Sequence, residues 1–547
     1  MAVVEVPEEL NVAQVHEAIA AVVPERECIV WRDRRLSWAE VTDRTRRLAA
    51  VLADHDLGIH TGLGEREPWT SPHDHVALYL HNGNEYLEGM LGAAKARCAS
   101  VNVNYRYVAD ELRHVLADSR ARAVLYHGAF APTLAEVVDD LPDLRLLLQV
   151  DDQSGAALLD GAIEYEAALA AATPLPPRGL SPDDLYILYT GGTTGLPKGV
   201  LWRQADFLAT CLGIASTTDE LVAGAPGSSL RVVAAPPFMH GAAHWNVVSA
   251  WCSGGTVVVQ DMPSRLDADD ILRTIAREGA TSLLIVGDAF ARPLADALRT
   301  GRHDVGHLRF LLTGGAILSA AVKQELLALV PGLNIVDVLG SSETGRQGIQ
   351  RSDLRSGAST GTFRPAPTAV VLSEDLTRVL EPGDPELGWL AQSGRVPLGY
   401  LGDPDKTART FPTVAGRRYA VAGDRARVLA GGEIELHGRD AVTINTGGEK
   451  VFAEEVEQAL KGHPAVFDAV VVGRPSERWG QEVVAVVHLR DTPEPPSDDD
   501  LRAGAALHLA RYKLPKAFVR VPAIERSPSG KPDYRWAREL AISATSP

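Results

Sequence analysis

Short apolar runs alternate with helix-like segments through the first part of this chain, and this alternation limits the folds available to it more than any other feature. The runs are Val76–Leu80, Ala123–Tyr126, Leu146–Val150, Leu185–Tyr189, Val232–Ala235, Val257–Val259, Leu283–Val286 and Arg309–Leu312. A strand buried on both faces reads as a continuous apolar run, and parallel strands require a long crossover between them. The pattern therefore predicts an α/β fold in which helices cover β-sheets.

The character of the sequence changes after about Leu387, where short strands and tight glycine turns such as Gly431–Gly432 indicate a β-rich subdomain. A compact last segment follows, in which we expect helices over 453–461 and 498–510 and strands over 466–472 and 483–489. A segment of about 110 residues is large enough to be a domain of its own. We therefore predict a large N-terminal domain over residues 1–437 and a small, mobile α+β domain over residues 438–547.

Composition excludes several classes of protein. The chain has 54 basic and 71 acidic residues, a net charge of −17, so its long-range field repels nucleic acids and anionic membranes. Its four cysteines lie far apart, without the paired spacing of zinc or redox sites, which predicts buried free thiols. The N-terminus lacks the pattern of a signal peptide, and no apolar run is long enough to predict a transmembrane helix. We therefore expect a cytoplasmic protein whose oligomeric state is open, a homodimer included.

The strongest chemical motif is the run from Tyr189 to Gly199, which directly follows an apolar strand. Its polar and flexible members are Thr190, Gly191, Gly192, Thr193, Thr194 and Lys198. Glycine lets backbone N–H groups approach a phosphate, hydroxyl groups donate hydrogen bonds, and lysine neutralises charge, so the run predicts a polyphosphate cradle. A Walker A loop is excluded because Pro197 precedes the lysine and Gly199 follows it. Lysine is rare in this chain, with nine residues in all, which makes its presence here more informative.

The run resembles the phosphate-binding loop of the adenylate-forming superfamily, which includes acyl-CoA synthetases, luciferases and the adenylation domains of nonribosomal peptide synthetases. Further motifs that resemble those of the superfamily follow in order: Gly314–Ala316, Gly340–Gly345, Tyr419–Asp424, Gly438–Arg439, Gly447–Lys450 and Ser529–Lys531. The resemblance thus covers essentially the whole chain. Within the superfamily, Gly199–Gln204, Met239–Gly241 and Val442–Lys450 are similar to acyl-CoA ligases for steroid side chains and other bulky acids.

This resemblance implies an enzyme that joins a carboxylate to AMP, with ATP and Mg²⁺, and then passes the acyl group to CoA. Glu343 would hold Mg²⁺, an ion that prefers oxygen ligands, and Ser342 would contact the α-phosphate. Asp424 would bind both ribose hydroxyls of the nucleotide, and Arg439 would add a donor in the same region.

The resemblance also places Gly315 and Ala316 at the nucleotide. It implies that Lys531 contacts the reacting carboxylate during adenylation, and it groups this lysine with Thr194 and Glu343 as catalytic residues. A lysine on an exposed turn suits a group that enters the site for one step and leaves for the next. The small domain would rotate between the two steps about a hinge next to Gly438.

For the second step, Gly447 and Gly448 would line the tunnel for the pantetheine arm of CoA, with Lys450 nearby. Arg474, Arg511 and Lys513 are further candidate partners for the CoA phosphates, with solvated surface positions as the alternative. The acyl pocket is expected at His240, Phe238, Gly241 and Trp245, whose large apolar neighbours favour a bulky hydrophobic acid, steroid-like or terpenoid-like. For Phe238 or Met239 taken alone, packing in the core is favoured over contact with the ligand.

Three functions remain open at this point. The first is an acid:CoA ligase; the second is an enzyme for a single half-reaction, or one that loads a carrier protein; the third is a noncatalytic binding protein. Two positions depart from the superfamily pattern. Ala441 stands where the hinge commonly has Asp or Lys, and Leu339 stands where many members have an aromatic residue against adenine. Lys198, Glu343, Asp424 and Lys531 are all retained, which argues against a pure binding protein.

Overall fold

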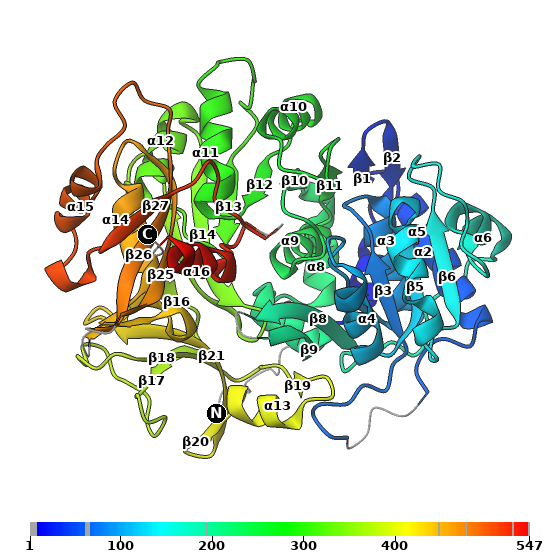
Figure 1. Cartoon of the computed structure of the whole chain (residues 1–547). Coiled ribbons are helices and arrows are strands. Elements are labelled where there is room, and N and C mark those ends of the chain that lie inside the picture. Colours follow the sequence, from blue (N-terminus) through cyan, green and yellow to red (C-terminus); the bar gives the residue numbers. More distant parts are fainter. Residues whose placement is uncertain are drawn as a thin grey trace. The chain divides into compact units, whose positions relative to one another are not determined.

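The computed structural model describes residues 8–60, 66–192, 195–446, 449–476, 479–527 and 530–544. The chain forms two compact units (Figure 1). The first comprises the described part of Met1–Leu284 together with Ser342–Arg346 and Gly394–Pro412, and the second comprises Ile285–Ser341, Gln347–Ser393 and the described part of Thr413–Pro547. The second unit therefore contains segments from both sides of residue 437, and the boundary between residues 437 and 438 stays a prediction.

A five-stranded parallel sheet in the order β4-β3-β5-β6-β7 begins the first unit. Its strands are β3 (His75–Tyr79), β4 (Ala99–Asn102), β5 (Ala121–His127), β6 (Leu146–Val150) and β7 (Ile163–Glu164). The helices around it are α2 (Trp38–Asp54), α3 (Asn84–Lys95), α4 (Ala109–Asp118), α5 (Ala131–Ala135) and α6 (Tyr165–Ala171) (Figure 1). Helix α2 begins at Ser37, whose side chain forms a reciprocal capping box with Glu40.

A second set of strands in the first unit runs in the order β12-β10-β11-β1-β2, with only the β1–β2 pair antiparallel. Its strands are β1 (Glu27–Trp31), β2 (Arg34–Ser37), β10 (Arg231–Ala234), β11 (Thr256–Val259) and β12 (Ser282–Ile285). Helices α9 (Gly241–Cys252) and α10 (Ala268–Glu278) pack against these strands. The unit also contains α1 (Val12–Ala20), α7 (Gln204–Asp206), α8 (Thr218–Gly224) and α13 (Pro404–Thr410). The predicted apolar runs of this region are thus strands covered by helices.

The run at Leu185–Tyr189 is a strand, but its pairing differs from the prediction of a parallel sheet. Strand β8 (Leu185–Gly192) pairs antiparallel with the next strand, β9 (Gly195–Arg203), and β9 pairs antiparallel with β19 (Gly399–Tyr400). The reason is the short glycine-rich connection, which has no room for the crossover helix that a parallel neighbour requires. The polyphosphate motif therefore lies on both strands of a hairpin.

In the second unit, β13 (Phe310–Gly314) and β14 (Asn334–Ser341) are parallel. Helix α11 (Gly287–Leu298) precedes β13, and helix α12 (Ala320–Leu329) connects the two strands. The sheet continues through β15 (Gly345–Ser352), β16 (Thr362–Pro365), β22 (Ile434–Arg439), β21 (Arg417–Val428), β18 (Gly388–Ser393) and β17 (Ala369–Leu372), and β20 (Thr413–Val414) pairs with β21. The neighbouring pairs β15–β16, β16–β22, β22–β21, β21–β18 and β18–β17 are all antiparallel. This arrangement matches the predicted β-rich subdomain.

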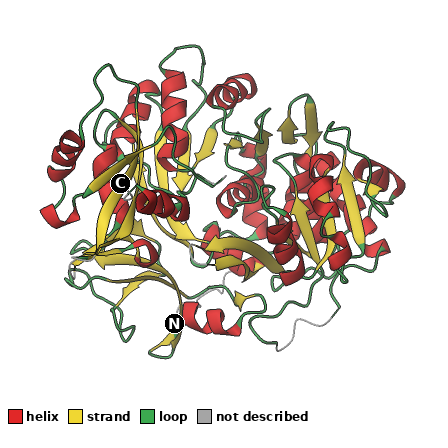
Figure 2. Ribbon diagram, in the orientation of Figure 1, coloured by secondary structure: helices red, strands yellow, loops and turns green. Residues whose placement is uncertain are grey.

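The last part of the second unit has its own sheet (Figure 2). It also has its own core of buried side chains. Its strands are β23 (Ile444–Thr446), β24 (Glu449–Val451), β25 (Val466–Ser476), β26 (Gly480–Leu489) and β27 (Ala517–Arg520), and its helices are α14 (Ala453–Lys461), α15 (Asp498–Ala506) and α16 (Tyr534–Ser543). The predicted elements are all present, although α15 ends at Ala506 instead of continuing to residue 510. The predicted α/β class and the smaller C-terminal α+β part are confirmed.

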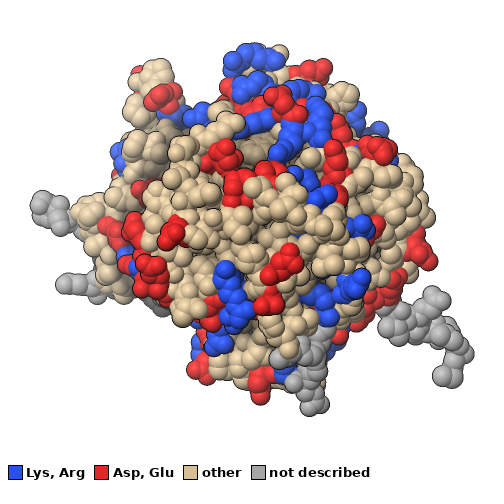
Figure 3. Space-filling view, turned by 90° about the vertical axis from the view of Figure 1, so that its right-hand side faces the viewer, with Lys and Arg blue, Asp and Glu red and all other residues tan. Residues whose placement is uncertain are grey.

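Acidic and basic side chains alternate in small groups on the face of the molecule that Figure 3 shows. In the first unit, Arg35 and Arg277 both form ion pairs with the buried Glu278. All four cysteines are buried free thiols, as predicted. Among the described residues, no helix has the length and apolar character needed to cross a bilayer.

Candidate functional site

Lys198 lies on strand β9 directly opposite Thr190 of strand β8, so the hairpin brings together two residues of the predicted cradle. The Lys198 ammonium pairs with Asp118 at the end of helix α4, with an Nζ–Oδ1 distance of 2.8 Å. The Tyr189 hydroxyl donates to the other oxygen of Asp118, also at 2.8 Å. Burial, together with the Asp118 charge, raises the pKa of Tyr189 well above its usual value. Asp118 therefore holds the lysine and its strand in position, and the sequence motif had not singled it out.

Gly199 has a steric role in this hairpin. A Cβ atom at this position would lie 2.7 Å from Cε2 of Tyr189, which is too close for any side chain. The glycine thus lets the tyrosine ring cross over the strand that carries Lys198 and reach Asp118. Thr193 and Thr194 lie outside the described residues, and Gly191, Gly192 and Gly195 lie at the adjoining ends of the two strands.

Glu343 belongs to the short segment Ser342–Arg346, which is part of the same unit as Lys198. The Tyr400 hydroxyl donates to Glu343 Oε1 at 2.8 Å, and the Trp202 indole N–H donates to the Ser342 carbonyl oxygen at 2.9 Å. Burial and the Glu343 charge both raise the pKa of Tyr400, so this phenol stays a hydrogen-bond donor. Strands β9 and β19, which pair with each other, thus position both residues of the predicted metal and α-phosphate site.

Lys406 is a further candidate that sequence reasoning missed. Its ammonium lies 4.0 Å from the centre of the Tyr400 ring, the same tyrosine that donates to Glu343. Burial lowers the pKa of Lys406; the Glu343 charge opposes this shift and the Lys198 charge adds to it. Within the described part of the chain, this ammonium has the ring contact but no ion pair. The available signal was the rarity of lysine, since Lys406 is one of only nine.

The arrangement around Glu343 fits a magnesium ion that arrives with a nucleotide. No group of three or more His, Cys, Asp or Glu side chains among the described residues could hold a metal ion without further ligands. Mg²⁺ is commonly bound through one or two carboxylates plus substrate phosphates and water. Glu343 offers one carboxylate, and the charges of Glu343 and Lys198 both act on Lys406, so a carboxylate and two cations lie in one region, as a site for a metal-bound phosphate requires.

In the second unit, the structure brings together Lys531 and Gly315. Gly315 has a φ of 79°, in the left-handed region that favours glycine, and a Cβ atom there would lie 3.7 Å from Cε of Lys531. The neighbouring Gly530 packs against Phe290 of helix α11, where a Cβ atom would lie 3.1 Å from the ring. The C-terminal loop thus directs its lysine to the loop after β13, where Gly315 and Ala316 were predicted to bind the nucleotide.

Asp424 and Arg439 face each other across the antiparallel pair of β21 and β22. Their Oδ1 and Nε atoms are 3.4 Å apart, and Asp424 is largely buried while Arg439 is more exposed. The pair leaves part of the Asp424 carboxylate able to accept further hydrogen bonds.

Leu339 is only 8% exposed and belongs to a core cluster with Phe363, Val371 and Leu390, so packing accounts for the apolar residue at this position.

The residues predicted for the acyl pocket surround the start of helix α9. His240 immediately precedes the helix and Gly241 is its first residue. A Cβ atom at Gly241 would lie 2.9 Å from Leu188 and 3.4 Å from the Trp245 indole, so these two side chains fill the space beside the glycine. Phe238 is 1% exposed, and its backbone N–H donates to Asn82 at 2.6 Å, which places it in the core.

The candidate CoA residues are in different situations. Arg474 is paired with Glu482 at 2.7 Å and Lys513 with Glu455 at 2.6 Å, so both already have carboxylate partners. Lys450 is exposed and 3.9 Å from Asp440, and Arg511 is exposed. Gly447 and Gly448 lie outside the described residues. Lys450 and Arg511 are therefore the cations of this group with the most freedom to meet a phosphate.

The sequence matches two protein-family models. Residues 16–401 match the AMP-binding enzyme model, and residues 455–531 match the model of the AMP-binding enzyme C-terminal domain. Among solved structures, the chain resembles the anthranilate CoA ligase AuaEII in complex with anthranoyl-AMP, with a TM-score of 0.82, 20% identity and full coverage of both chains. At this identity the likeness concerns the fold.

Curated relatives match over nearly their full lengths. The medium-chain acyl-CoA ligase Mig of Mycobacterium avium is 52% identical over 97% of this chain and 98% of its own. The 3-oxocholest-4-en-26-oate–CoA ligase of Rhodococcus rhodochrous is 39% identical over 97% of this chain and 96% of its own. The resemblance inferred from the motifs is thereby confirmed, and the chain belongs to the AMP-binding enzyme family, the adenylate-forming enzymes.

Proposed function

We propose that this protein is an acyl-CoA ligase that activates a hydrophobic carboxylic acid with ATP and transfers the acyl group to CoA. The observation that carries the proposal is the cluster of the first unit, in which the Lys406 ammonium rests on Tyr400, the tyrosine that donates to Glu343, and the charges of Glu343 and Lys198 both act on Lys406. Two cations and one carboxylate suit a magnesium-bound polyphosphate better than they suit any neutral ligand. The retained Lys531 argues against a noncatalytic binding protein, which would have no use for a catalytic lysine.

In the first step, an oxygen of the substrate carboxylate attacks the α-phosphorus of ATP and the bond to pyrophosphate breaks. Lys198 exchanges its Asp118 partner for phosphate oxygens, and Lys406 neutralises charge that develops on the leaving pyrophosphate. Glu343 would hold Mg²⁺ together with the phosphates, and the bound ion would supply further positive charge. Tyr400 fixes the orientation of the Glu343 carboxylate through its hydrogen bond.

The residues of the second unit serve the nucleotide and the carboxylate in this proposal. Asp424 accepts hydrogen bonds from the ribose hydroxyls, and Lys531 stabilises the negative charge where carboxylate and phosphate approach each other. In the second step the sulfur of CoA attacks the acyl carbon, its thiol proton is lost to solvent, and AMP leaves. The cytoplasmic location, a homodimer and the hinge beside Gly438 stay predictions.

Two classes of acid are candidates. The large apolar side chains around helix α9 and the 39% identical relative named as a steroid-acid ligase support a bulky, ring-containing acid. The 52% identical relative named as a medium-chain ligase supports a straight-chain acid. Both classes bind through apolar contacts and differ in the shape and depth of pocket that they need.

The test is to incubate the purified protein with steroid, terpenoid and straight-chain acids, with and without ATP, Mg²⁺ and CoA. Pyrophosphate, acyl-AMP and acyl-CoA are measured separately. We expect acyl-CoA, AMP and pyrophosphate only in the complete mixture. Accumulation of acyl-AMP in the presence of CoA would indicate an adenylating enzyme for another acceptor, and acyl-CoA made only from supplied acyl-AMP would indicate a thioesterifying enzyme.

A further inference from the structure

Two asparagine side chains at the carboxyl edge of the five-stranded parallel sheet bind backbone groups of other elements. Asn102 is the last residue of β4 and lies beside Leu78 of β3, and Asn82 belongs to the loop that follows β3. The carboxyl edge of a parallel sheet is where the loops of an α/β unit come together. The amides of Asn82 and Asn102 are therefore placed to hold segments that come from outside this sheet.

The first of these segments is the loop of residues 236–240, which ends at the predicted acyl-pocket histidine and which we call the acyl loop. Asn82 Oδ1 accepts from the Phe238 backbone N–H at 2.6 Å, and Asn82 Nδ2 donates to the Pro236 carbonyl oxygen at 3.0 Å. The Phe238 carbonyl oxygen accepts from Nδ1–H of His244 at 2.8 Å. Asn82 is 1% exposed, so its two bonds are shielded from water and costly to break. The acyl loop is thus held as a rigid piece.

The second segment is strand β8, which leads into the predicted polyphosphate cradle and is the outer strand of the sheet β19-β9-β8. The Tyr189 backbone N–H donates to Asn102 Oδ1 at 2.7 Å, and Asn102 Nδ2 donates to the Tyr189 carbonyl oxygen at 2.8 Å. Two residues that face each other in an antiparallel ladder exchange the same two bonds. The side-chain amide of Asn102 therefore takes the place of a neighbouring strand and attaches β8 to β4.

Asn102 also joins the two segments to each other. Its Nδ2 donates a further hydrogen bond to the Met239 carbonyl oxygen, in the acyl loop, at 2.6 Å. An amide nitrogen carries two hydrogens, so one serves Tyr189 and the other serves Met239. The Tyr189 hydroxyl in turn donates to Asp118, whose other oxygen pairs with Lys198. A continuous path of hydrogen bonds and one ion pair thus runs from the acyl loop through Asn102 to the lysine of the cradle.

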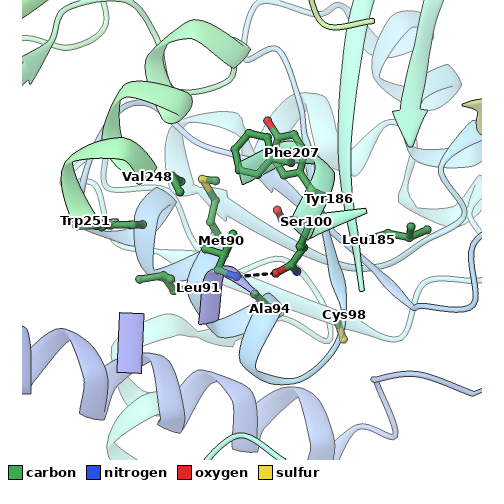
Figure 4. Close-up of a pocket in the computed structure, with 12 residues that line it drawn as sticks. Met90, Leu91, Ala94, Cys98, Ser100, Leu185, Tyr186, Phe207, Val248 and Trp251 are labelled. Carbon is green, nitrogen blue, oxygen red and sulfur yellow. Dashed lines mark hydrogen bonds between the residues drawn. The ribbon is translucent and has the colours of Figure 1, made fainter. Parts of the chain in front are cut away.

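Ser100 provides a comparison for Asn102 on the same strand. Alternate residues of a strand point to the same face of the sheet, so the two side chains share a face. Ser100 lines an internal cavity of about 30 Å³ together with Leu185 and Tyr186 of β8 (Figure 4). This volume is about that of one water molecule, so the cavity holds no substrate. Ser100 therefore lies where β4 and β8 meet, as Asn102 does, but it contacts the cavity.

We propose that Asn102 is a positioning residue for adenylation: it holds the acyl loop and the cradle strand at a fixed separation, so that carboxylate and α-phosphorus meet in line. This inference rests on the proposed function and deepens it. In the first step the acid and ATP are separate molecules, and the protein alone aligns them. In the second step the acyl group and AMP are already joined by a covalent bond, so the ligand itself fixes their separation.

Asn102→Ala and Asn102→Asp test this role. Alanine removes all three hydrogen bonds, whereas aspartate keeps the acceptor for the Tyr189 N–H and loses both donated bonds. Three quantities are measured with an acid that the wild type activates: kcat of ATP–pyrophosphate exchange, the rate of thioester formation from supplied acyl-AMP, and the Kd of the matching acyl-sulfamoyladenosine, an unreactive analogue of the acyl-adenylate.

For both variants we expect kcat of the exchange to fall by up to about 100-fold, because a misplacement of about 1 Å can cost this much. KM for ATP and KM for the acid should stay close to the wild-type values, because each segment still forms its own side of the site. Thioester formation and the Kd should also stay close to the wild type. This split separates alignment of two reactants from a general loss of structure.

Ser100→Ala is the matched control, and it should keep all three wild-type values. Thermal unfolding establishes that each variant is folded. An equal loss in all three quantities would make Asn102 a purely structural residue, and an unchanged exchange rate in both Asn102 variants would remove its role in adenylation; either result overturns the inference. If the folded wild type shows no exchange with any acid of the panel, the proposed function fails instead.

Discussion

At the scale of single residues, the few lysines of this chain divide into structural and available ones. Lys95 and Lys323 are fully buried and paired with Glu17 at 2.6 Å and with Asp337 at 2.7 Å. Such buried pairs hold the fold together, because removal of one partner would leave an uncompensated charge. Lys406 differs in that its ammonium rests on an aromatic ring and has no carboxylate partner within the described residues. It can therefore bind an anion without first breaking an ion pair.

Lys406→Ala should raise KM for ATP and lower kcat for adenylation, because a cation near the phosphates is lost. A charge-assisted contact of this kind is worth about 1.5–3 kcal/mol, or roughly 10- to 150-fold in kcat/KM. ATP–pyrophosphate exchange measures this step directly. Lys406→Arg, which keeps the charge, should recover a large part of the activity. If both substitutions lowered the unfolding free energy equally and left the ATP kinetics unchanged, Lys406 would have a structural role and no role in ATP binding.

Lys531→Ala should separate the two half-reactions. The loop that carries Lys531 lies against Gly315, where the nucleotide is predicted, so adenylation should fall by a factor of about 100 or more. Thioester formation from supplied acyl-AMP should stay close to the wild-type rate. The exposed Lys516, also in the C-terminal segment, gives the control Lys516→Ala, for which both rates should be unchanged. An equal loss in both half-reactions would contradict the role of Lys531.

At the scale of secondary-structure elements, strand β22 and helix α14 meet at a glycine. Gly438, the last residue but one of β22, has a φ of 128°, and a Cβ atom there would lie 2.6 Å from Oε2 of Glu454. The absent side chain leaves space for the Glu454 carboxyl, whose Oε2 is buried without a hydrogen-bond partner among the described residues. Burial, with the nearby Glu457 charge, raises the pKa of Glu454 to about 8.

Glu454 should make the unfolding free energy depend on pH. Between pH values near 4.5 and 8 the folded protein keeps the proton that the unfolded chain releases, so stability falls as the pH rises through this range. The loss is of the order of a few kcal/mol. Glu454→Gln cannot ionise and should flatten the curve, being more stable than the wild type at pH 8. Urea unfolding at several pH values measures this, with exposed Glu525→Gln expected to retain the wild-type slope.

At the scale of the whole molecule, the second unit contains a part with a core of its own. Two clusters of buried side chains lie entirely within the C-terminal segment, one around Val456, Leu460 and Leu501 and the other around Val470 and Val484. They cover the two faces of the sheet formed by β23 to β27, with helices α14 and α15 on one side and α16 on the other. A segment whose hydrophobic residues are buried against each other can fold without the remainder of the chain.

The fragment 438–547 should therefore fold by itself with a cooperative thermal transition. Circular dichroism should show both helix and strand, and amide exchange should protect β25 and β26, which form the longest pairing in this segment. A fragment that begins at residue 466 lacks helix α14, whose Val456 and Leu460 cover the face of the sheet that carries Val471. It should unfold at a lower temperature, and failure of the longer fragment to fold would place the domain boundary elsewhere.

The sequence alone predicted the α/β class, most strands of the first unit and the elements of the C-terminal part. It could do so because burial on both faces produces continuous apolar runs, and because caps such as Ser37 with Glu40 depend on neighbouring residues. The order of the motifs also indicated the family. Patterns of this kind depend on a few neighbouring residues, so they can be recognised in the sequence before any tertiary contact is known.

Only the tertiary structure decided which residues meet. The partnership of Lys198 with Asp118 and the hydrogen bond from Tyr400 to Glu343 join positions far apart in the sequence, and through Tyr400 the nearby Lys406 is brought to Glu343. The antiparallel pairing of β8 with β9 and the stacking of Tyr186 on Phe207 likewise depend on strand neighbours and packing. A local pattern records whether a side chain is buried, but the identity of its neighbour is determined by the path of the whole chain in space.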